Sequence, residues 1–472
     1  MSDSQARDHH TVAKMGFSEE GEILALQVNT IAALGGYLSN FAPSIPGNSY
    51  PQTLTGLYRT PVAHLRVRGA YTNTVPVDAY RGSGRPEATW VNERLTEQGA
   101  HELGIDVADI RRRNLIRRDD FPYPTPGGRT YDCGDPPLLF NKLITLANYN
   151  SLRTEQVSLR NEGVLMGIGI SCFLDKSGTG NSANLASRGG MHGGYESAIV
   201  RVHSDGRVTL FSGSHSHGQG HETVFKQIVC DRLGLDPAII RYVQGDTDIV
   251  TYGRGTFNSR SVSIGGSAVS LACDKTIEKA TRIAAHLLEA AEDDIDFANG
   301  LFTVRGTDRT LTILEAAAAA FEPSKLPPEI EPGLNEVGTF VPQYWNWPTG
   351  VQICELEIDP ETGETEISKF VCVDDVGTVI NPLLLKAQMH GGIVQGIGQA
   401  LMENIAYDVD GQLISGSLFD YALPRADDTC LMDVVSAPTI TESNLIGAKG
   451  GGDKGKLFFN KNIKFWEENL LN

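Results

Sequence analysis

The strongest constraint on the fold of this chain is the placement of its glycines. The sequence has 51 glycines in 472 residues, and many of them lie in short clusters between segments with the pattern of a strand or a helix. Glycine adopts positive φ without strain and lets a ligand approach the backbone closely. Clusters of this kind differ from a flexible linker, and they predict a folded chain whose loops approach a ligand.

Composition narrows the classes of function. Acidic residues outnumber basic ones by 58 to 40, so the formal net charge is −18. This balance argues against nucleic acid or an anionic membrane as the main partner. The seven cysteines are scattered without a CxxC motif, which fits reduced thiols in a cytoplasmic protein better than disulfides or a zinc site. No apolar run of about 18 residues is present, so we predict no membrane span.

The hydrophobic pattern predicts an α+β fold, because strands and helices alternate irregularly. Residues 16–39 are typical of a hairpin, and residues 87–118 of two helices separated at Gly104. The basic run in the second of these helices predicts a solvated or subunit-facing surface. Further hairpins are expected around 205–206 and 359–363, and further helices at 222–233, 265–292 and 381–404.

One glycine-containing turn combines backbone freedom with side chains that suit anions. The segment AYRGSGRP at 79–86 lies between an extended segment and a helical one, and it carries Arg81 and Arg85. Guanidinium groups and the N–H groups of a helix N-terminus both bind oxoanions. This turn is therefore a candidate anion site. The alternative is an ordinary turn with two surface arginines.

Three other turns have similar properties. SHSHGQGHETVF (214–225) places Gly-Gln-Gly before a helix, GRGTFNSRSVSIGG (253–266) gathers hydroxyl groups, and GAKGGGDKGK (447–456) is rich in glycine and lysine. Hydroxyls and free amides together form phosphate nests. The histidines of the first segment do not predict a metal site, because their spacing crosses the turn. The last segment fails as a P-loop at Leu457. Together these turns predict one extended ligand held by several loops.

At this point the chain resembles the molybdenum-binding large subunit of the xanthine dehydrogenase and aldehyde oxidase family, most closely its carbon monoxide dehydrogenase branch. The segments ARDHH, LGGYLSN, YTNTVPVDAYRGSGRPEA, GQGHETVFKQI, EIDPETGE, GSLFDYALPRADD and GAKGGGDKG carry the resemblance in this order. It implies two molybdopterin-binding α+β domains, the first incomplete. We expect the C-terminal part of the first domain at 1–125, a linker at 126–150, the second domain at 151–456 and an atypical tail at 457–472.

The resemblance also implies a molybdopterin cofactor with molybdenum, in the cytosine dinucleotide form, and no metal ligand from the protein. Four segments would contact it. The molybdenum would lie beside Ala79, Tyr80, Arg81 and Gly82, and the pterin and its phosphates would contact Gly218, Gln219, Gly220 and His221. The dinucleotide side would be lined by Ser259, Arg260, Ser261 and Ser263, and the site would be closed by Lys449 and Gly450.

The implied activity is hydroxylation of an aldehyde or an N-heterocycle with oxygen from water. Asp453 stands where the family has a glutamate as general base, and aspartate is one methylene shorter. Gly82 stands where the carbon monoxide dehydrogenase branch has a copper-binding cysteine, so we expect no copper, because Cu(I) prefers thiolate.

The implied partners are an iron–sulfur (2Fe-2S) small subunit and an FAD-binding medium subunit, in a dimer of heterotrimers. The family's first third has no counterpart before Met1, so we expect a partial chain. The alternative function is a non-catalytic fragment that only packs on partner subunits.

Overall fold

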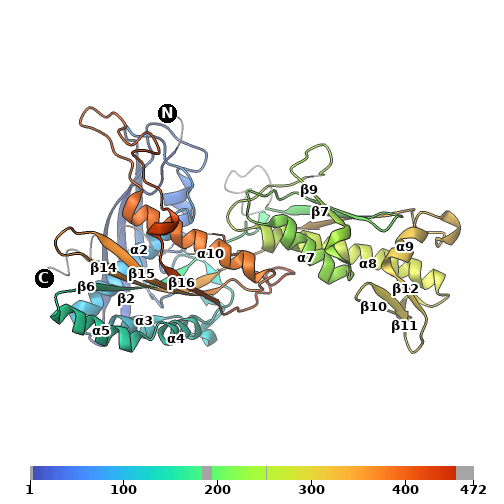
Figure 1. Cartoon of the computed structure of the whole chain (residues 1–472), viewed down its shortest axis with the longest axis horizontal. Coiled ribbons are helices and arrows are strands. Elements are labelled where there is room, and N and C mark those ends of the chain that lie inside the picture. Colours follow the sequence, from blue (N-terminus) through green and yellow to red (C-terminus); the bar gives the residue numbers. More distant parts are fainter. Residues whose placement is uncertain (1–3, 183–193, 251, 453–472) are drawn as a thin grey trace.

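The computed structural model describes residues 4–182, 194–250 and 252–452. They form an elongated molecule with two lobes (Figure 1). The large lobe contains residues 4–174 and 349–452, and the small lobe contains residues 196–340. The chain therefore leaves the large lobe, builds the small lobe and returns. The fold is α+β, as predicted.

The first sheet of the large lobe has the order β1-β2-β3, with β1 (His9–Phe17), β2 (Ile23–Ala33) and β3 (Ala63–Ala70). Strands β1 and β2 are antiparallel, which confirms the predicted hairpin, and β3 runs parallel to β2. Helix α2 (Arg85–Leu103) packs on this sheet, and helix α3 (Val107–Asn114) follows it. Gly104 ends α2 at φ 66°, so the predicted pair of helices is confirmed.

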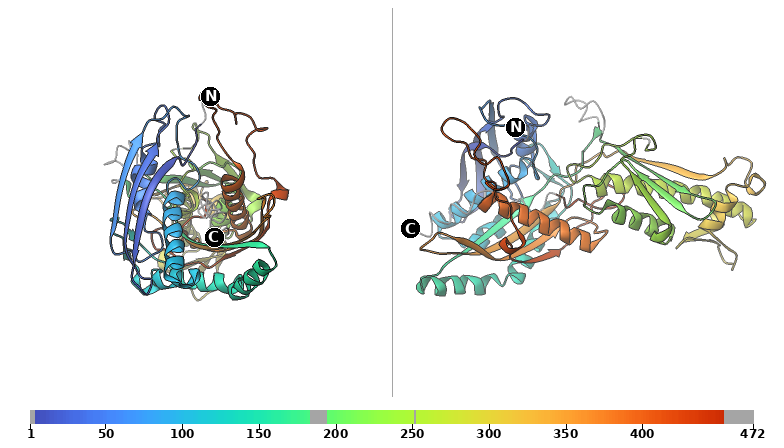
Figure 2. Two further views of the ribbon diagram at one scale, coloured as in Figure 1. Left: turned by 90° about the vertical axis from the view of Figure 1, so that its left-hand side faces the viewer. Right: turned by 45° about the horizontal axis from the view of Figure 1, so that its top comes forward.

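The second sheet of the large lobe has the order β16-β15-β14-β6. Its strands are β6 (Leu165–Leu174), β14 (Thr349–Ile358), β15 (Thr365–Asp375) and β16 (Leu431–Ser436). Helices α4 (Pro136–Leu146) and α5 (Tyr149–Asn161) lie at one face and α10 (Pro382–Ile397) at the other. The hairpin β14–β15 confirms the turn expected at 359–363. In Figure 2 the first sheet and α10 stand on opposite sides of this lobe.

The range expected to be a linker, 126–150, contains a packed helix. Leu139, Phe140 and Leu143 of α4 are buried in the same core as Val351 and Val371 of the second sheet. Tyr58 and Ala100 from the first part of the chain belong to this core as well. One hydrophobic core therefore joins the first segment of the chain to the sheet formed by its last third.

The small lobe consists of a sheet in the order β13-β7-β8-β9, covered by two helices. Its elements are β7 (Glu196–Val202), β8 (Val208–Ser212), α7 (His221–Leu233), β9 (Ile240–Gln244), α8 (Ser267–Leu287), β10 (Ile295–Ala298), β11 (Leu301–Val304), β12 (Thr310–Thr312), α9 (Ile313–Ala319) and β13 (Leu334–Phe340). The hairpin β7–β8 and helix α7 confirm the predictions for 205–206 and 222–233. Helix α8 ends five residues before the predicted end at 292.

The remaining elements are short. They are η1 (Ile45–Ser49), α1 (Tyr50–Gln52), η2 (Arg118–Asp120), β4 (Tyr123–Pro124), β5 (Thr130–Tyr131), η3 (Pro237–Ile239), η4 (Ser261–Gly266), η5 (Glu292–Asp294), η6 (Pro323–Lys325), η7 (Gly398–Met402) and η8 (Ala426–Asp428). Within the described ranges no helix has the length and apolarity needed to cross a membrane.

The basic run of α3 differs from its prediction, because Arg111 is fully buried. Its Nε donates to Glu93 at 2.9 Å and its Nη2 to Glu97 at 2.8 Å, both on α2, and Nη2 also donates to the carbonyl of Ile170 in β6 at 3.1 Å. Tyr58 donates to the other oxygen of Glu93 at 2.6 Å. The prediction of a wholly solvated or subunit-facing helix is therefore wrong for Arg111, which joins α2 and α3 to the second sheet.

We predict that Arg111→Ala destabilises the protein by about 3–5 kcal/mol, because it leaves two buried carboxylates without their cation. The control is Arg112→Ala, since Arg112 is 42% exposed and pairs with the exposed Asp109. Exposed pairs contribute about 1 kcal/mol or less. Urea unfolding followed by circular dichroism measures both, and equal losses for the two variants would contradict the role given to Arg111.

Candidate cofactor site

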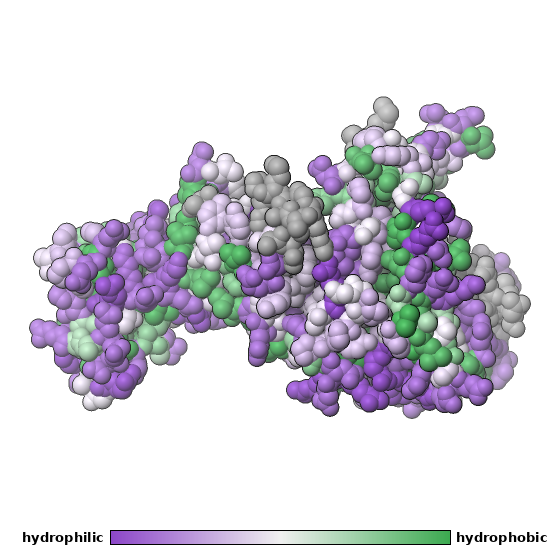
Figure 3. Space-filling view, turned by 180° about the vertical axis from the view of Figure 1, so that it is seen from behind, coloured by the Kyte–Doolittle hydropathy of each residue, from purple (hydrophilic) through white to green (hydrophobic). Residues whose placement is uncertain are grey.

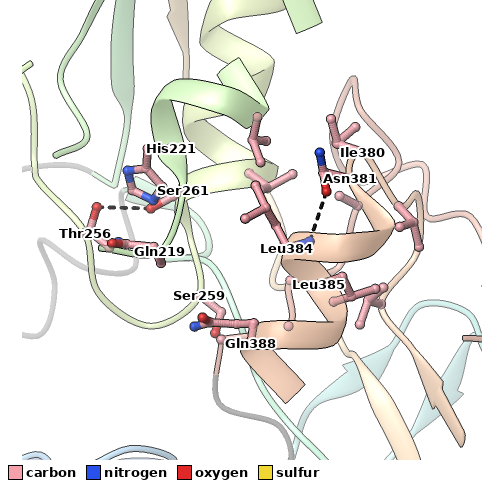
Figure 4. Close-up of a pocket in the computed structure, with 18 of the residues that line it drawn as sticks. Gln219, His221, Thr256, Ser259, Ser261, Ile380, Asn381, Leu384, Leu385 and Gln388 are labelled. Carbon is pink, nitrogen blue, oxygen red and sulfur yellow. Dashed lines mark hydrogen bonds between the residues drawn. The ribbon is translucent and has the colours of Figure 1, made fainter. Parts of the chain in front are cut away.

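A cavity of about 290 Å³ lies where the two lobes meet, and we call it the junction cavity. The small lobe contributes α7 and the segment 256–262, and the large lobe contributes the segment that leads into α10 and the turn before residue 453 (Figure 4). The lining residues are Gln219, His221, Val224, Thr256, Phe257, Asn258, Ser259, Ser261, Val262, Val376, Thr378, Val379, Ile380, Asn381, Leu384, Leu385, Gln388, Ala448 and Gly450–Gly452. None of these side chains carries a formal charge when His221 is neutral.

The Gly218-Gln219-Gly220 turn forms one wall of the junction cavity. Gly218 and Gly220 both have positive φ, 94° and 80°, and Gly220 is the N-cap of α7. A Cβ at Gly220 would lie 2.7 Å from Leu384 Cδ1, so glycine allows the lobes to approach here. The side-chain oxygen of Gln219 accepts from Ser216 Oγ at 3.2 Å and from the amide of His217. Its NH₂ group is therefore oriented to donate elsewhere.

His221 is the first residue of α7 and is only 4% exposed. Its Nδ1 is buried and has no hydrogen-bond partner in the part of the chain that the structure describes. Burial, and then the neighbouring His217 and His215, lowers the pKa of His221 to about 4. The imidazole is therefore neutral near pH 7, and it lines the cavity beside amides of the first helical turn that lack intrahelical acceptors.

The segment 256–266 contributes hydroxyl groups, and only some of them face the cavity. Thr256 and Ser261 are hydrogen bonded through their hydroxyls at 3.1 Å (Figure 4). Ser259, which has φ 51°, also lines the cavity. Ser263 is fully buried in the start of the helix, where its hydroxyl donates to the carbonyl of Arg260 at 3.4 Å. Ser259 and Ser261 thus lie at the cavity, whereas Ser263 lies behind it.

Arg260 is fully buried and does not line the junction cavity. Its Nη1 lies 2.5 Å from Glu196 Oε2, and Nη2 donates to the carbonyl of Tyr195 at 2.9 Å. Nη1 also donates to the carbonyl of Gly255 at 2.7 Å. The guanidinium that was expected on the dinucleotide side therefore holds the segment 255–260 against β7.

Lys449 is likewise buried away from the junction cavity. Its Nζ lies 2.7 Å from Asp375 Oδ2 and donates to the carbonyl of Cys133 at 3.0 Å. The charge of Asp375 raises the pKa of Lys449 despite the opposing effect of burial. The next residue, Gly450, does line the cavity, at φ 92°, and a Cβ there would lie 2.7 Å from the carbonyl oxygen of Ser259. Lys449 therefore anchors the turn, and Gly450 closes it.

Arg81 connects the first glycine-containing turn to the same place. Its Nε donates to the carbonyl of Gly452 at 2.6 Å, and its Nη2 to the carbonyl of Gln388 at 3.1 Å. Both acceptors belong to residues that line the junction cavity. Ala79 and Tyr80 line a different cavity, which is described below.

Gly82 has φ 92°, and a Cβ there would lie 2.6 Å from Pro86 Cγ. This backbone conformation favours glycine. A cysteine at this position would require the turn to shift.

Asp453 lies outside the described residues. Sequence reasoning missed the segment 376–388, which supplies eight lining residues to the large-lobe wall: Val376, Thr378, Val379, Ile380, Asn381, Leu384, Leu385 and Gln388.

 The sequence signal that could have found this segment is Asn381-Pro382, since the Asn381 side chain accepts from the amide of Leu384 at 2.9 Å and starts α10.

Comparison with protein-family models identifies the class of this chain. Residues 142–430 match one molybdopterin cofactor-binding domain model and residues 1–115 match another. The first match covers more than half of the chain, so the chain belongs to the molybdopterin cofactor-binding domain family.

Individual relatives agree with this assignment. The carbon monoxide dehydrogenase large chain of Hydrogenophaga pseudoflava is 36% identical over 452 residues, which are 94% of this chain and 56% of that relative. The structure is similar to that of a Cu,Mo-CO dehydrogenase, with a TM-score of 0.92, 35% identity, and coverage of 99% of this chain and 60% of the other. It is also similar to quinoline 2-oxidoreductase from Pseudomonas putida 86, with a TM-score of 0.90, 32% identity, and coverage of 97% and 58%. The chain spans about half the length of the curated relatives it matches.

We predict that the stability of the protein falls as the pH is lowered from 6.5 towards 4. The unfolded chain binds a proton at His221 in this window and the folded chain does not, so protonation favours unfolding. With allowance for partial solvent screening, His221 contributes about 1–2 kcal/mol to this loss.

The measurement is the free energy of urea unfolding against pH for the native chain and for His221→Gln. The variant should show a flatter profile between pH 6.5 and 4. The control is His101→Gln, because the His101 side chain is 55% exposed. An unchanged slope in His221→Gln would show that His221 does not remain neutral in the folded protein.

Proposed function

We propose that this chain forms part of the catalytic subunit of a molybdenum hydroxylase, which hydroxylates an aldehyde or an N-heterocycle with oxygen from water. The observation that carries this proposal is the junction cavity, where His221 lies at the N-terminus of α7 and its buried Nδ1 has no hydrogen-bond partner among the described residues. A buried polar atom without a partner is costly. A ligand with hydrogen-bonding groups at this position removes that cost.

The residues at the cavity fit a pterin dinucleotide. The Gln219 NH₂ group, the first amides of α7 and the hydroxyls of Ser259 and Ser261 are neutral donors, and a helix N-terminus favours phosphate. Gly450–Gly452 line the cavity next to Ser259 and bring no side chain into it. We assign molybdopterin to this cavity, in the cytosine dinucleotide form that the family resemblance implies. When bound, the molybdenum of this cofactor supplies the two-electron oxidation chemistry.

The chain's own part in the reaction is to position groups and to accept a proton. Hydroxylation of a C–H bond with water releases two electrons and two protons for each product molecule. We assign the general base to Asp453, which directly follows the cavity-lining Gly452. Arg81 donates to the carbonyl of Gly452 at 2.6 Å, and this bond fixes the position of Gly452, the residue before Asp453 in the sequence.

The remaining assignments concern partners and metals. The electrons leave through a 2Fe-2S subunit and an FAD-binding subunit, in a cytoplasmic dimer of heterotrimers. Copper has no role in this proposal, because Gly82 supplies no thiolate and its positive φ disfavours a side chain. An aldehyde or an N-heterocycle is therefore the substrate, in place of carbon monoxide.

We predict that Gln219→Ala and Arg81→Ala both lower the molybdenum content by at least about tenfold, because each removes a hydrogen bond at the junction cavity. Molybdenum is measured by elemental analysis and pterin by fluorescence, on protein co-expressed with its neighbouring genes. The controls are Gln98→Ala on the exposed face of α2 and Arg118→Ala, whose side chain is 77% exposed. Absence of molybdenum and pterin from the native chain would favour a non-catalytic packing role.

We predict that Asp453→Asn keeps its molybdenum and loses about 100-fold or more in kcat/KM, because a general base contributes that much. Asp453→Glu restores the missing methylene and should retain at least the native rate. Steady-state kinetics on metal-loaded protein measures both variants. Unchanged kcat/KM in Asp453→Asn would show that the base is another group.

A further inference from the structure

A second cavity, of about 890 Å³, lies in the large lobe, and we call it the outer cavity. Its walls come from the N-terminal segment 4–8, the turn at 79–80 and the segment after α10. The lining residues are Ser4, Gln5, Ala6, Arg7, Asp8, Thr74, Val75, Ala79, Tyr80, Gln399, Glu403, Asn404, Ile405, Tyr407, Leu413, Ser415–Leu418 and Tyr421. Three tyrosines and several aliphatic side chains give these walls the character of a site for a flat organic molecule.

The outer cavity adjoins the candidate cofactor site through two consecutive residues. Tyr80 lines the outer cavity, and Arg81 is hydrogen bonded to residues that line the junction cavity. Gln395 joins the two, since its Nε2 donates to Tyr80 Oη at 3.0 Å and its Oε1 accepts from Arg81 Nη1 at 3.3 Å. A molecule in the outer cavity is therefore placed next to the turn that borders the candidate cofactor site.

Glu403 is held in a fixed position in this cavity. Its Oε2 accepts from Tyr421 Oη at 2.7 Å and from Tyr80 Oη at 3.4 Å. Burial, and then the hydrogen bond to Glu403, raises the pKa of Tyr421, so this phenol stays protonated and continues to donate. The carboxylate has further lone pairs beyond those that the two tyrosines occupy.

The charges around the outer cavity favour a cation. Of the described residues that line it, three are charged: Arg7, Asp8 and Glu403. The Arg7 guanidinium is matched by Glu87, with Nε and Oε2 3.7 Å apart, and it also stacks on the Tyr80 ring at 4.9 Å. Its charge is thereby offset within the protein. The two carboxylates leave the cavity with an excess of negative charge.

We propose that the outer cavity binds a planar substrate that carries a positively charged or N–H-bearing nitrogen, and that Glu403 is the residue that selects it. This assignment rests on the proposed function, because the bound molecule is a substrate only if the chain is part of a molybdenum hydroxylase. Recognition of a cation does not depend on the proposed reaction, because a carboxylate fixed among tyrosines binds a planar cation by charge-assisted hydrogen bonds and by stacking. A neutral ring of the same shape gains only the stacking.

The test compares benzamidine, a planar cation, with benzamide, which has nearly the same shape and no charge. Isothermal titration calorimetry on the full chain gives both dissociation constants. We expect benzamidine to bind about tenfold tighter or more, and Glu403→Gln to remove that preference. Glu366→Gln, on the exposed side of β15, is the matched control and should keep it. Tyr421→Phe should weaken benzamidine binding by a smaller factor, because one donor to Glu403 is lost.

Equal affinities for the two probes in the native chain would overturn the proposal, even if Glu403→Gln fails to fold. A preference that persists in a folded Glu403→Gln variant would also overturn it. Molybdenum content is measured on the same preparations. If the protein contains molybdenum but shows no preference for benzamidine, this inference alone is refuted. If the protein never acquires molybdenum but shows a preference that depends on Glu403, the proposed function is refuted and the recognition of cations stands.

Discussion

The architecture of the junction cavity depends on buried cations that are paired with carboxylates inside the protein. Arg85 Nε lies 2.6 Å from Asp175, Arg260 Nη1 lies 2.5 Å from Glu196, and Lys449 Nζ lies 2.7 Å from Asp375. All of these side chains are nearly or fully buried. Each cation comes from a glycine-containing turn and each carboxylate from a strand or the residue after it. Because a broken buried pair costs several kcal/mol, these pairs fix the turns without placing net charge in the cavity.

The same pairs explain which site residues could be predicted from the sequence. Gln219, His221, Ser259, Ser261 and Gly450 do meet in one cavity, because glycine turns and helix starts are local features that the sequence displays directly. The sequence equally predicted that the neighbouring basic residues, Arg260 and Lys449, bind the ligand. Arg260 and Lys449 instead face carboxylates 64 and 74 residues away. Nothing local distinguishes a cation that binds a ligand from one that neutralises a buried acid.

The fold likewise has elements that local sequence predicts and contacts between distant segments that it does not. The hairpins β1–β2, β7–β8 and β14–β15 and the helices α2 and α7 follow from turn residues and periodicity, and they were predicted. The return of the chain to the large lobe was not, because it depends on pairing between strands that are far apart in the sequence. Strand β6 pairs with β14, and Leu174 lies opposite Thr349. Helix α4 lies in the range expected to be a linker, and its Leu139 and Phe140 are buried in a core that residues distant in the sequence complete.

A site built from both lobes also links their positions to the bound ligand. Direct contacts across the junction include three hydrogen bonds: Asn381 donates to Gln227 at 2.8 Å, Arg85 donates to Asn258 at 2.7 Å, and the amide of Leu445 donates to Ser267 at 3.2 Å. Gly220 also packs against Leu384. Away from this junction, the segment after α10 that lines the outer cavity projects from the large lobe. It exposes Val409, Leu418 and Phe419, and the surface there carries hydrophobic side chains among hydrophilic ones (Figure 3). A ligand that contacts both α7 and α10 would stabilise the observed arrangement of the lobes by its binding free energy. Neutral donors suit this role, because their hydrogen bonds depend steeply on distance and angle and therefore form only when both lobes hold their donors in the observed positions.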